Sequence, residues 1–154
     1  MPSWYRDPNA PAPNVTRRVG VIGLLERGDA VLLQRRSDDG EWDFIGGKLD
    51  EEETVLDALR REVREETGLA VVEPSLVGIY SDPTRIIEYP DGTVCRLLSV
   101  VFRAGAGEGE PRASEESVEL RFVGREELRA LDVWPSVRPI RDAYLADPGR
   151  LVIE

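Results

Sequence analysis

The sequence predicts an α/β fold in which strands and helices share one domain. The chain has 154 residues, a length typical of a single domain. Its residues are 41% apolar and 32% charged, as in a folded globular protein. Short runs of β-forming residues alternate with segments of helical periodicity, and this mixed order indicates an α/β or α+β architecture.

An extended arm is predicted for residues 1–17, followed by one domain over residues 18–154. The arm holds four prolines and two asparagines, a composition typical of irregular backbone. It contains no apolar stretch like that of a secretory signal, and nowhere does the chain approach the roughly 20 apolar residues of a membrane helix. Together with the single cysteine, these features favour a cytoplasmic protein that does not act at a membrane.

Three strands are predicted before the first helix, at residues 18–26, 30–34 and 42–45. The first two are apolar runs joined by the turn signal Gly28-Asp29, which indicates a β-hairpin. A second turn at residues 37–40 leads into the third strand, which ends at Gly46-Gly47.

The clearest helix follows these strands. Its apolar residues fall at spacings of three, four and seven and define one stripe: Val55, Leu56, Leu59 and Val63. Asp50 followed by Glu53 predicts an N-cap with its capping-box partner. Gly68 lies just beyond the end of the stripe, where a C-cap glycine is expected.

The second half of the chain predicts three further strands and two short helices. The strands are expected at residues 71–80, 93–103 and 120–123. The helices are expected at residues 126–131 and 136–146. Loops are expected at residues 81–92 and 104–117, which are rich in turn-forming residues.

Composition excludes several classes of site. The chain has no histidine, which rules out Ser-His-Asp and Cys-His catalysis and imidazole ligands for zinc. A net charge of −10 argues against non-specific binding to nucleic acid or to an anionic membrane. An acidic protein that handles phosphates needs a cation between itself and its substrate.

Three glutamates of the predicted helix point to such a cation. Glu62, Glu65 and Glu66 stand at i, i+3 and i+4, so they share one helical face with Cβ atoms about 5–6 Å apart. A hard divalent ion such as Mg²⁺ or Mn²⁺ prefers carboxylate oxygens and would relieve their mutual repulsion. The plainer alternative is a solvated acidic face that pairs with neighbouring arginines.

The segment from Gly47 to Leu69 resembles the Nudix box. After Gly47, five residues precede Glu53 and seven more precede Arg61. The remaining matching positions follow directly: Glu62, Val63, Glu65, Glu66, Gly68 and Leu69. No required position of the box is missing, which makes the motif a strong signal.

Two flanking stretches resemble the same family more weakly. Ile45 stands where the family usually has proline, and Phe122 stands where tryptophan is common. Nudix proteins fold as an α/β/α sandwich around a mixed β-sheet. The predicted order of strands and helices is compatible with that fold.

The resemblance implies a hydrolase that cleaves a nucleoside diphosphate linked to another group. Water attacks a phosphorus of the pyrophosphate, and bound Mg²⁺ (or Mn²⁺) neutralises charge and lowers the pKa of that water. The resemblance also implies the metal ligands: Glu62, Glu65, Glu66 and the backbone carbonyl of Gly46. Arg61 and Glu53 are expected to orient these carboxylates without binding the ion.

The resemblance leaves the general base open between two positions. Glu62 is one candidate, and a glutamate of the later loop is the other, with Glu116 ahead of Glu115. Glu65 completes the predicted catalytic set. For the loop glutamates the alternative is a solvated surface with no catalytic part.

Three residues are candidates for substrate binding. Arg85 could bind a phosphate, while Tyr80 and Trp42 could stack on a nucleobase. The alternatives are a loop salt bridge for Arg85 and core positions for the aromatic residues. The loop around Arg85 resembles one found in some ADP-ribose-hydrolysing members. ADP-ribose or another nucleoside diphosphate sugar is therefore placed ahead of nucleoside triphosphates, oxidised ones included, and of diadenosine polyphosphates.

Two classes of function follow from the resemblance. The first is an enzyme with a small-molecule nucleotide as substrate and no nucleic-acid partner. The second is a catalytically silent Nudix-fold domain that binds or senses a nucleotide. Degraded box positions would favour the second class, and none is degraded here. The proline-rich arm could cross to a second copy of the chain, which leaves a homodimer open.

Overall fold

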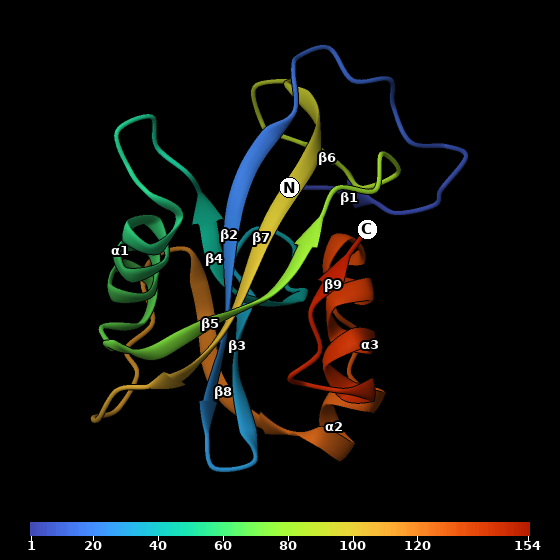
Figure 1. Cartoon of the computed structure of the whole chain (residues 1–154). Helices are drawn as coiled ribbons and strands as arrows, with labels where there is room; N and C mark the ends of the chain where they lie inside the picture. Colours follow the sequence, from blue (N-terminus) through green and yellow to red (C-terminus); the bar gives the residue numbers. More distant parts are fainter.

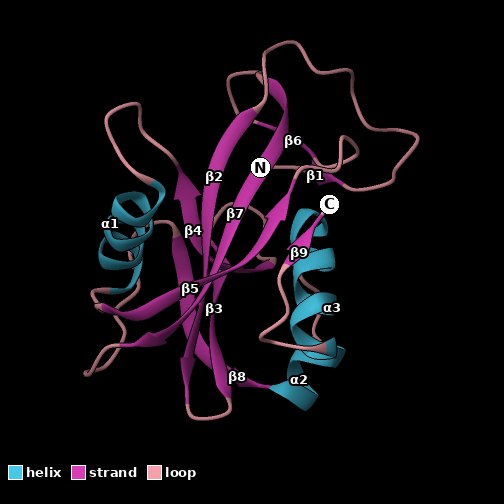
Figure 2. Cartoon of the chain, in the orientation of Figure 1, coloured by secondary structure: helices cyan, strands magenta, loops and turns pink.

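The computed structural model describes residues 1–154 as a curved β-sheet with helices on both sides (Figure 1). The strands are β1 (Ser3–Trp4), β2 (Arg18–Arg27), β3 (Ala30–Arg36), β4 (Trp42–Lys48), β5 (Val71–Tyr80), β6 (Ile86–Glu88), β7 (Val94–Ala106), β8 (Ser117–Gly124) and β9 (Val152–Ile153). The helices are α1 (Val55–Thr67), α2 (Arg125–Ala130), α3 (Arg138–Ala146) and a 3₁₀ turn at Pro135–Val137. Figure 2 shows α1 on one side of the sheet and α2 with α3 on the other, as in the expected sandwich.

Mixed pairing defines the sheet. Its main path runs β1-β6-β7-β2-β4-β3-β8, and β5 pairs with β7 and β9. The central pair, β2 and β7, is parallel, with Val21 opposite Val100. β2 pairs antiparallel with both β3 and β4, which confirms the predicted hairpin.

Side-chain alternation along β2 divides the core into two clusters. Val21 and Leu25 are 1% and 0% exposed and belong to the cluster beneath α1. Leu24 is 2% exposed and belongs to the cluster beneath α3. Full burial of such a side chain contributes about 1.5–3 kcal/mol, so both faces of the strand anchor helices. Gly23 leaves room for α1, because a Cβ there would lie 3.0 Å from Leu59 Cδ1.

Helix α1 ends where the sequence predicts and begins differently. Gly68 adopts a φ of 75° and caps the C-terminus, as expected. The N-cap is Thr54, whose hydroxyl accepts from the amide of Asp57 in a capping box, so the predicted Asp50–Glu53 box is wrong. Asp50 and Glu53 form a separate turn before the helix, in which the Glu53 carboxylate accepts from the Asp50 amide and from Arg61.

Three short strands were not predicted, and β7 and β8 extend into the loop expected at residues 104–117. β6 lies inside the loop predicted at residues 81–92, and β1 lies inside the predicted arm. The two strands pair with each other, Ser3 opposite Ile87, and β6 also pairs with β7. Both are too short for a period-two pattern to show, so partner strands rather than local sequence define them.

The N-terminal residues lie on the domain of their own chain. The Pro2 carbonyl accepts from the amide of Glu88 at 3.0 Å, and the Met1 carbonyl accepts from Trp134 Nε1 at 3.1 Å. Further along, Asn14 pairs with Val94 through backbone and side chain. Crossing to a second subunit stays a prediction. None of the helices combines the length and apolar character needed to cross a bilayer.

Candidate active site

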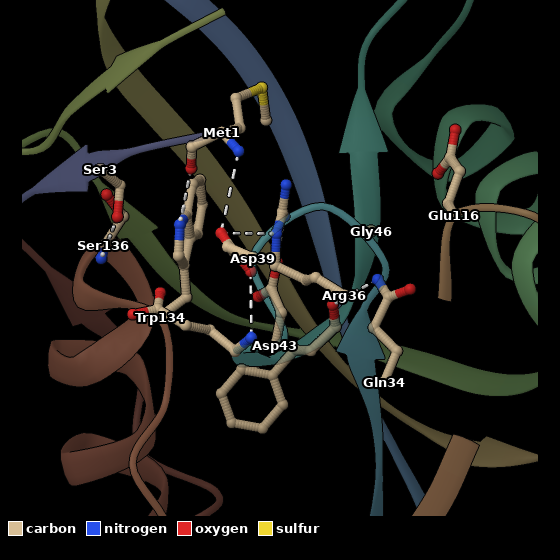
Figure 3. Close-up of polar contacts among 12 residues, drawn as sticks. Met1, Ser3, Gln34, Arg36, Asp39, Asp43, Gly46, Glu116, Trp134 and Ser136 are labelled. Atoms are coloured by element: carbon tan, nitrogen blue, oxygen red, sulfur yellow. Dashed lines mark hydrogen bonds and ion pairs between the residues drawn. The ribbon is translucent and has the colours of Figure 1, made fainter. Parts of the chain in front are cut away.

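A cleft of about 510 Å³ lies where β2, β3, β4 and β7 meet the N-terminal residues and α1. Its lining includes Gly46, Gly47 and Glu116 beside α1. Figure 3 shows Gly46 and Glu116 on one side of this region, with Met1 and Trp134 on the other. The cleft therefore joins the glycine turn and the glutamates to a second, aromatic end.

Two of the three helix glutamates face the cleft. Glu62 and Glu66 line it, and Glu66 is only 4% exposed. The Glu66 Oε2 atom accepts from the amide of Gly46 at 3.3 Å and from Gln34 Nε2 at 3.2 Å. The Glu65 side chain is 59% exposed and does not line the cleft.

Burial and mutual repulsion raise the pKa values of the cleft glutamates. Desolvation, followed by the charge of Glu62, raises the pKa of Glu66 to about 9. Desolvation also raises the pKa of Glu62, although Arg61 lowers it. The nearby charge of Glu116 adds to both shifts. The cleft thus brings acidic groups together, and Glu66 among them has no basic side chain paired with it.

Arg61 holds acidic groups of α1 and of the turn that precedes it. Its guanidinium donates to Glu62 at 2.8 Å, to Glu65 at 3.3 Å and to Glu53 Oε2 at 2.9 Å. It also donates to the Lys48 carbonyl at 3.0 Å, which ties the helix to the end of β4. Hydrogen bonding to Arg61 lowers the pKa of Glu53. These contacts match the orienting role expected for Arg61 and Glu53.

Two adjacent glycines allow the close approach of backbone and helix. A Cβ on Gly46 would lie 2.2 Å from the Val21 carbonyl oxygen of the neighbouring strand. A Cβ on Gly47 would lie 2.3 Å from the Glu62 Cδ atom. The sheet therefore requires a glycine at position 46, and the position of the Glu62 carboxylate requires one at position 47.

Gly47→Ala is expected to reduce kcat by about 10²-fold with little loss of thermal stability. The new methyl group displaces the Glu62 carboxylate, and misplacing a catalytic group by about 1 Å can reduce the rate by that factor. Steady-state kinetics and thermal unfolding measure the two effects. Gly124→Ala serves as the control, since nothing lies within 4 Å of a Cβ there. Gly46→Ala should instead destabilise the fold. Unchanged kcat in Gly47→Ala would contradict this packing.

The residues present fit a divalent cation by donor chemistry. Glu62 and Glu66 supply oxygens in the cleft, Glu66 has no basic side chain paired with it, and hard cations prefer such ligands. No three acidic side chains surround one point as they stand. Glu65, which lies outside the cleft, would have to rotate toward it to share an ion with Glu62 and Glu66.

The late loop brings one predicted glutamate to the cleft. Glu116 is exposed and lines the cleft, whereas its neighbour Glu115 does not. The backbone amide and hydroxyl of Ser37 both donate to the Glu116 carbonyl at 3.0 Å. Glu119 lies outside the cleft and pairs with Arg35 at 3.9 Å. Of the loop glutamates, Glu116 alone has the placement needed for a base.

The three predicted substrate contacts have different surroundings. Arg85 lines the cleft but is 0% exposed, and its guanidinium donates to the carbonyls of Tyr80 and Ser136 and to the Ser99 hydroxyl. Tyr80 is 2% exposed and lies in the core outside the cleft. Trp42 also lies outside the cleft, under the guanidinium of Arg121. The cleft geometry gives no support to stacking by either aromatic residue.

Several residues that line the cleft were not predicted from the sequence. Arg36 bonds to Asp43 at 3.1 Å, and its guanidinium lies 4.6 Å from the centre of the Trp134 ring (Figure 3). Burial raises the pKa of Asp43 to about 6, against the effect of Arg36. Gln34 lies one alternation earlier on β3. The strand ends in three polar residues, and its period of two places Gln34 and Arg36 on one face, which was the signal that could have revealed these two.

Comparison with known proteins gives a consistent result. A model of the NUDIX domain matches residues 15–144. A MutT-like protein of Streptomyces ambofaciens is 36% identical over 111 residues, covering 71% of this chain and 66% of that protein. An ADP-ribose pyrophosphatase of Methanocaldococcus jannaschii is 35% identical over 116 residues, covering 73% of this chain and 65% of that protein. The match thus spans just under two thirds of both relatives.

A solved structure agrees with these matches. The MutT protein of Bacillus halodurans superposes with a TM-score of 0.71 and 28% identity, covering 88% of this chain and 86% of that one. The matched NUDIX domain contains the glycine turn, the glutamates of α1 and the late loop that together line the cleft. The chain therefore belongs to the Nudix hydrolase family.

Proposed function

We propose that the chain is a metal-dependent pyrophosphohydrolase that cleaves a nucleoside diphosphate linked to another moiety. The observation that carries the proposal is the set of acidic groups in one cleft: Glu62 and Glu66 on α1 and Glu116 opposite them. Their mutual repulsion and partial burial suit a site that gains a cation together with an anionic substrate.

Glu62, Glu66 and the Gly46 carbonyl would hold the divalent ion, with Glu65 joining them from the exposed side of α1. Such an ion neutralises phosphate charge and lowers the pKa of the attacking water, and Mg²⁺ or Mn²⁺ suits oxygen ligands of this kind. Arg61 keeps the Glu62 carboxylate in place through its 2.8 Å hydrogen bond. The chain thus supplies a carboxylate set that is fixed from behind and open toward the cleft.

Glu116 is the better placed of the two candidate bases. Its side chain is exposed and lines the cleft, while its backbone is fixed to Ser37. Glu62 is already engaged by Arg61, which reduces its freedom to take a proton. In this proposal Glu116 accepts the proton of the attacking water, and the product leaves as a nucleoside monophosphate.

The remainder of the cleft suits a nucleoside. Ile22, Ile87 and Leu97 give it an apolar wall, and Tyr89 and Trp134 add aromatic surface. Planar bases bind well against such surfaces. The likeness to an ADP-ribose pyrophosphatase supports ADP-ribose or another nucleoside diphosphate sugar as the substrate.

Hydrolysis of a nucleotide panel tests the proposal. The panel holds ADP-ribose, nucleotide sugars, canonical and oxidised deoxynucleoside triphosphates and diadenosine polyphosphates, each with Mg²⁺ or Mn²⁺. We expect the nucleoside diphosphate sugars to be cleaved fastest, with the products identified by chromatography and all activity lost in EDTA. Nucleotide binding by calorimetry without turnover of any compound would instead show a silent nucleotide sensor.

A further inference from the structure

Gln34 occupies an unusual position beside the acidic cluster. It is 5% exposed on β3, and its side chain lines the cleft next to Glu66. Its Nε2 atom donates to Glu66 Oε2 at 3.2 Å and to the Phe44 carbonyl at 3.3 Å. Because a carbonyl oxygen can only accept, the amide must present its NH₂ group to these partners. Its Oε1 atom therefore points to neither.

The Oε1 atom of Gln34 is buried and has no hydrogen-bond partner. An unsatisfied buried acceptor lowers stability, and such groups in folded proteins call for an explanation. The two preceding residues, Leu32 and Leu33, are fully buried and apolar, so the strand buries apolar side chains up to the position before Gln34. Packing alone does not account for a glutamine here.

The contacts of Glu66 indicate what the glutamine does. Two donors, the Gly46 amide and Gln34 Nε2, meet at the same carboxylate oxygen, Oε2. Two hydrogen bonds on one oxygen fix the carboxylate plane and leave the other oxygen available to a ligand. Neighbours that orient a metal-binding carboxylate in this way commonly tune its affinity.

We propose that Gln34 is a positioning residue, which holds Glu66 through Nε2 and offers Oε1 to a water molecule bound in the cleft. The inference rests on the proposed function, since it concerns the same carboxylate. It adds a residue outside the Nudix box to the groups that determine ion binding. In this proposal Gln34 Oε1 binds water when the cleft holds an ion, and it lowers the stability of the protein when the cleft holds none.

Gln34→Met tests the inference, because methionine has a similar size and neither donates nor leaves a strong acceptor unpaired. We expect thermal unfolding in EDTA to occur close to the wild-type temperature, because losing the Gln34 donor to Glu66 and Phe44 opposes the gain from removing the unpaired Oε1 acceptor. Mn²⁺ affinity, measured by calorimetry, should fall by about 10-fold or more. In steady-state kinetics kcat should fall by a similar factor while KM stays within about twofold.

Leu32→Met is the matched control, since Leu32 lies on the same strand, is fully buried and does not line the cleft. It should leave Mn²⁺ affinity and kcat unchanged. Equal Mn²⁺ affinity and kcat in the two variants would overturn the role of Gln34 and leave the proposed function standing. Failure of the wild-type chain to bind Mn²⁺ would overturn the proposed function and this inference together. A lower unfolding temperature with unchanged Mn²⁺ affinity would show a purely structural glutamine.

Discussion

Glu66→Gln is expected to stabilise the metal-free chain while reducing turnover by at least about 10³-fold. The glutamine keeps the shape of the side chain and can still accept from Gly46 and Gln34, so the local fold should persist. It loses the charge that a cation needs, and loss of metal-supplied stabilisation of several kcal/mol corresponds to a rate loss of this order. Turnover of the best substrate at saturating Mg²⁺ measures the effect.

The stability gain of Glu66→Gln should depend on pH in a defined direction. The folded-state pKa of Glu66 is raised to about 9 from an ordinary value of 4.5, chiefly by burial. The folded chain therefore holds this proton when the unfolded chain has released it, and stability is lost as pH rises from about 4.5 toward 9. Glutamine does not titrate, so the gain grows across that window and reaches about 3 kcal/mol at pH 7.

Unfolding in EDTA at pH 5 and pH 8 measures this difference. Glu52→Gln provides the control, because Glu52 is exposed in the turn before α1. That variant should show neither the stability gain nor the loss of turnover. Wild-type turnover in Glu66→Gln would remove Glu66 from the metal site, and a stability gain equal at both pH values would contradict its raised pKa.

The sequence predicted those elements whose local residue pattern is enough to determine their structure. The apolar stripe of α1 and the cap at Gly68 are local properties, and both are found in the structure. The N-cap was misassigned because Asp50 satisfies the same local pattern as Thr54. In the structure the helix begins after Thr54, and Arg61 of the helix donates to Glu53 in the turn that precedes it. A sequence pattern cannot rank two caps that tertiary contacts distinguish.

Some residues of the site could likewise be predicted from local sequence, and others could not. Glu62, Glu66 and Gly46 were predictable because the box fixes their spacing within one strand, turn and helix. Trp134 was not, since it is nearly 90 residues from Gly46 and reaches the cleft only through the packing of the C-terminal region on the sheet. Tyr80 shows the reverse error: an aromatic residue at the end of a strand turned out to be core.

Glu116→Gln is expected to lower kcat by about 10²-fold and to leave KM within about twofold. General-base catalysis contributes about 10²–10⁴-fold, and glutamine keeps the size and polarity of the side chain without its basic oxygen. Because Glu116 is exposed, the fold should tolerate the change. The Ser37 contacts involve only its backbone carbonyl and are retained.

Glu115→Gln is the matched control. It removes the same charge from the adjacent residue, which does not line the cleft. If long-range charge alone mattered, the two variants would lose similar activity. If Glu116 takes the proton, only its own variant loses activity, and the loss persists at saturating metal concentration. A change in kcat of less than about threefold in Glu116→Gln would return the role to Glu62. In that case the base would be a group that Arg61 already holds, and proton transfer would have to proceed through a carboxylate shared with the cation.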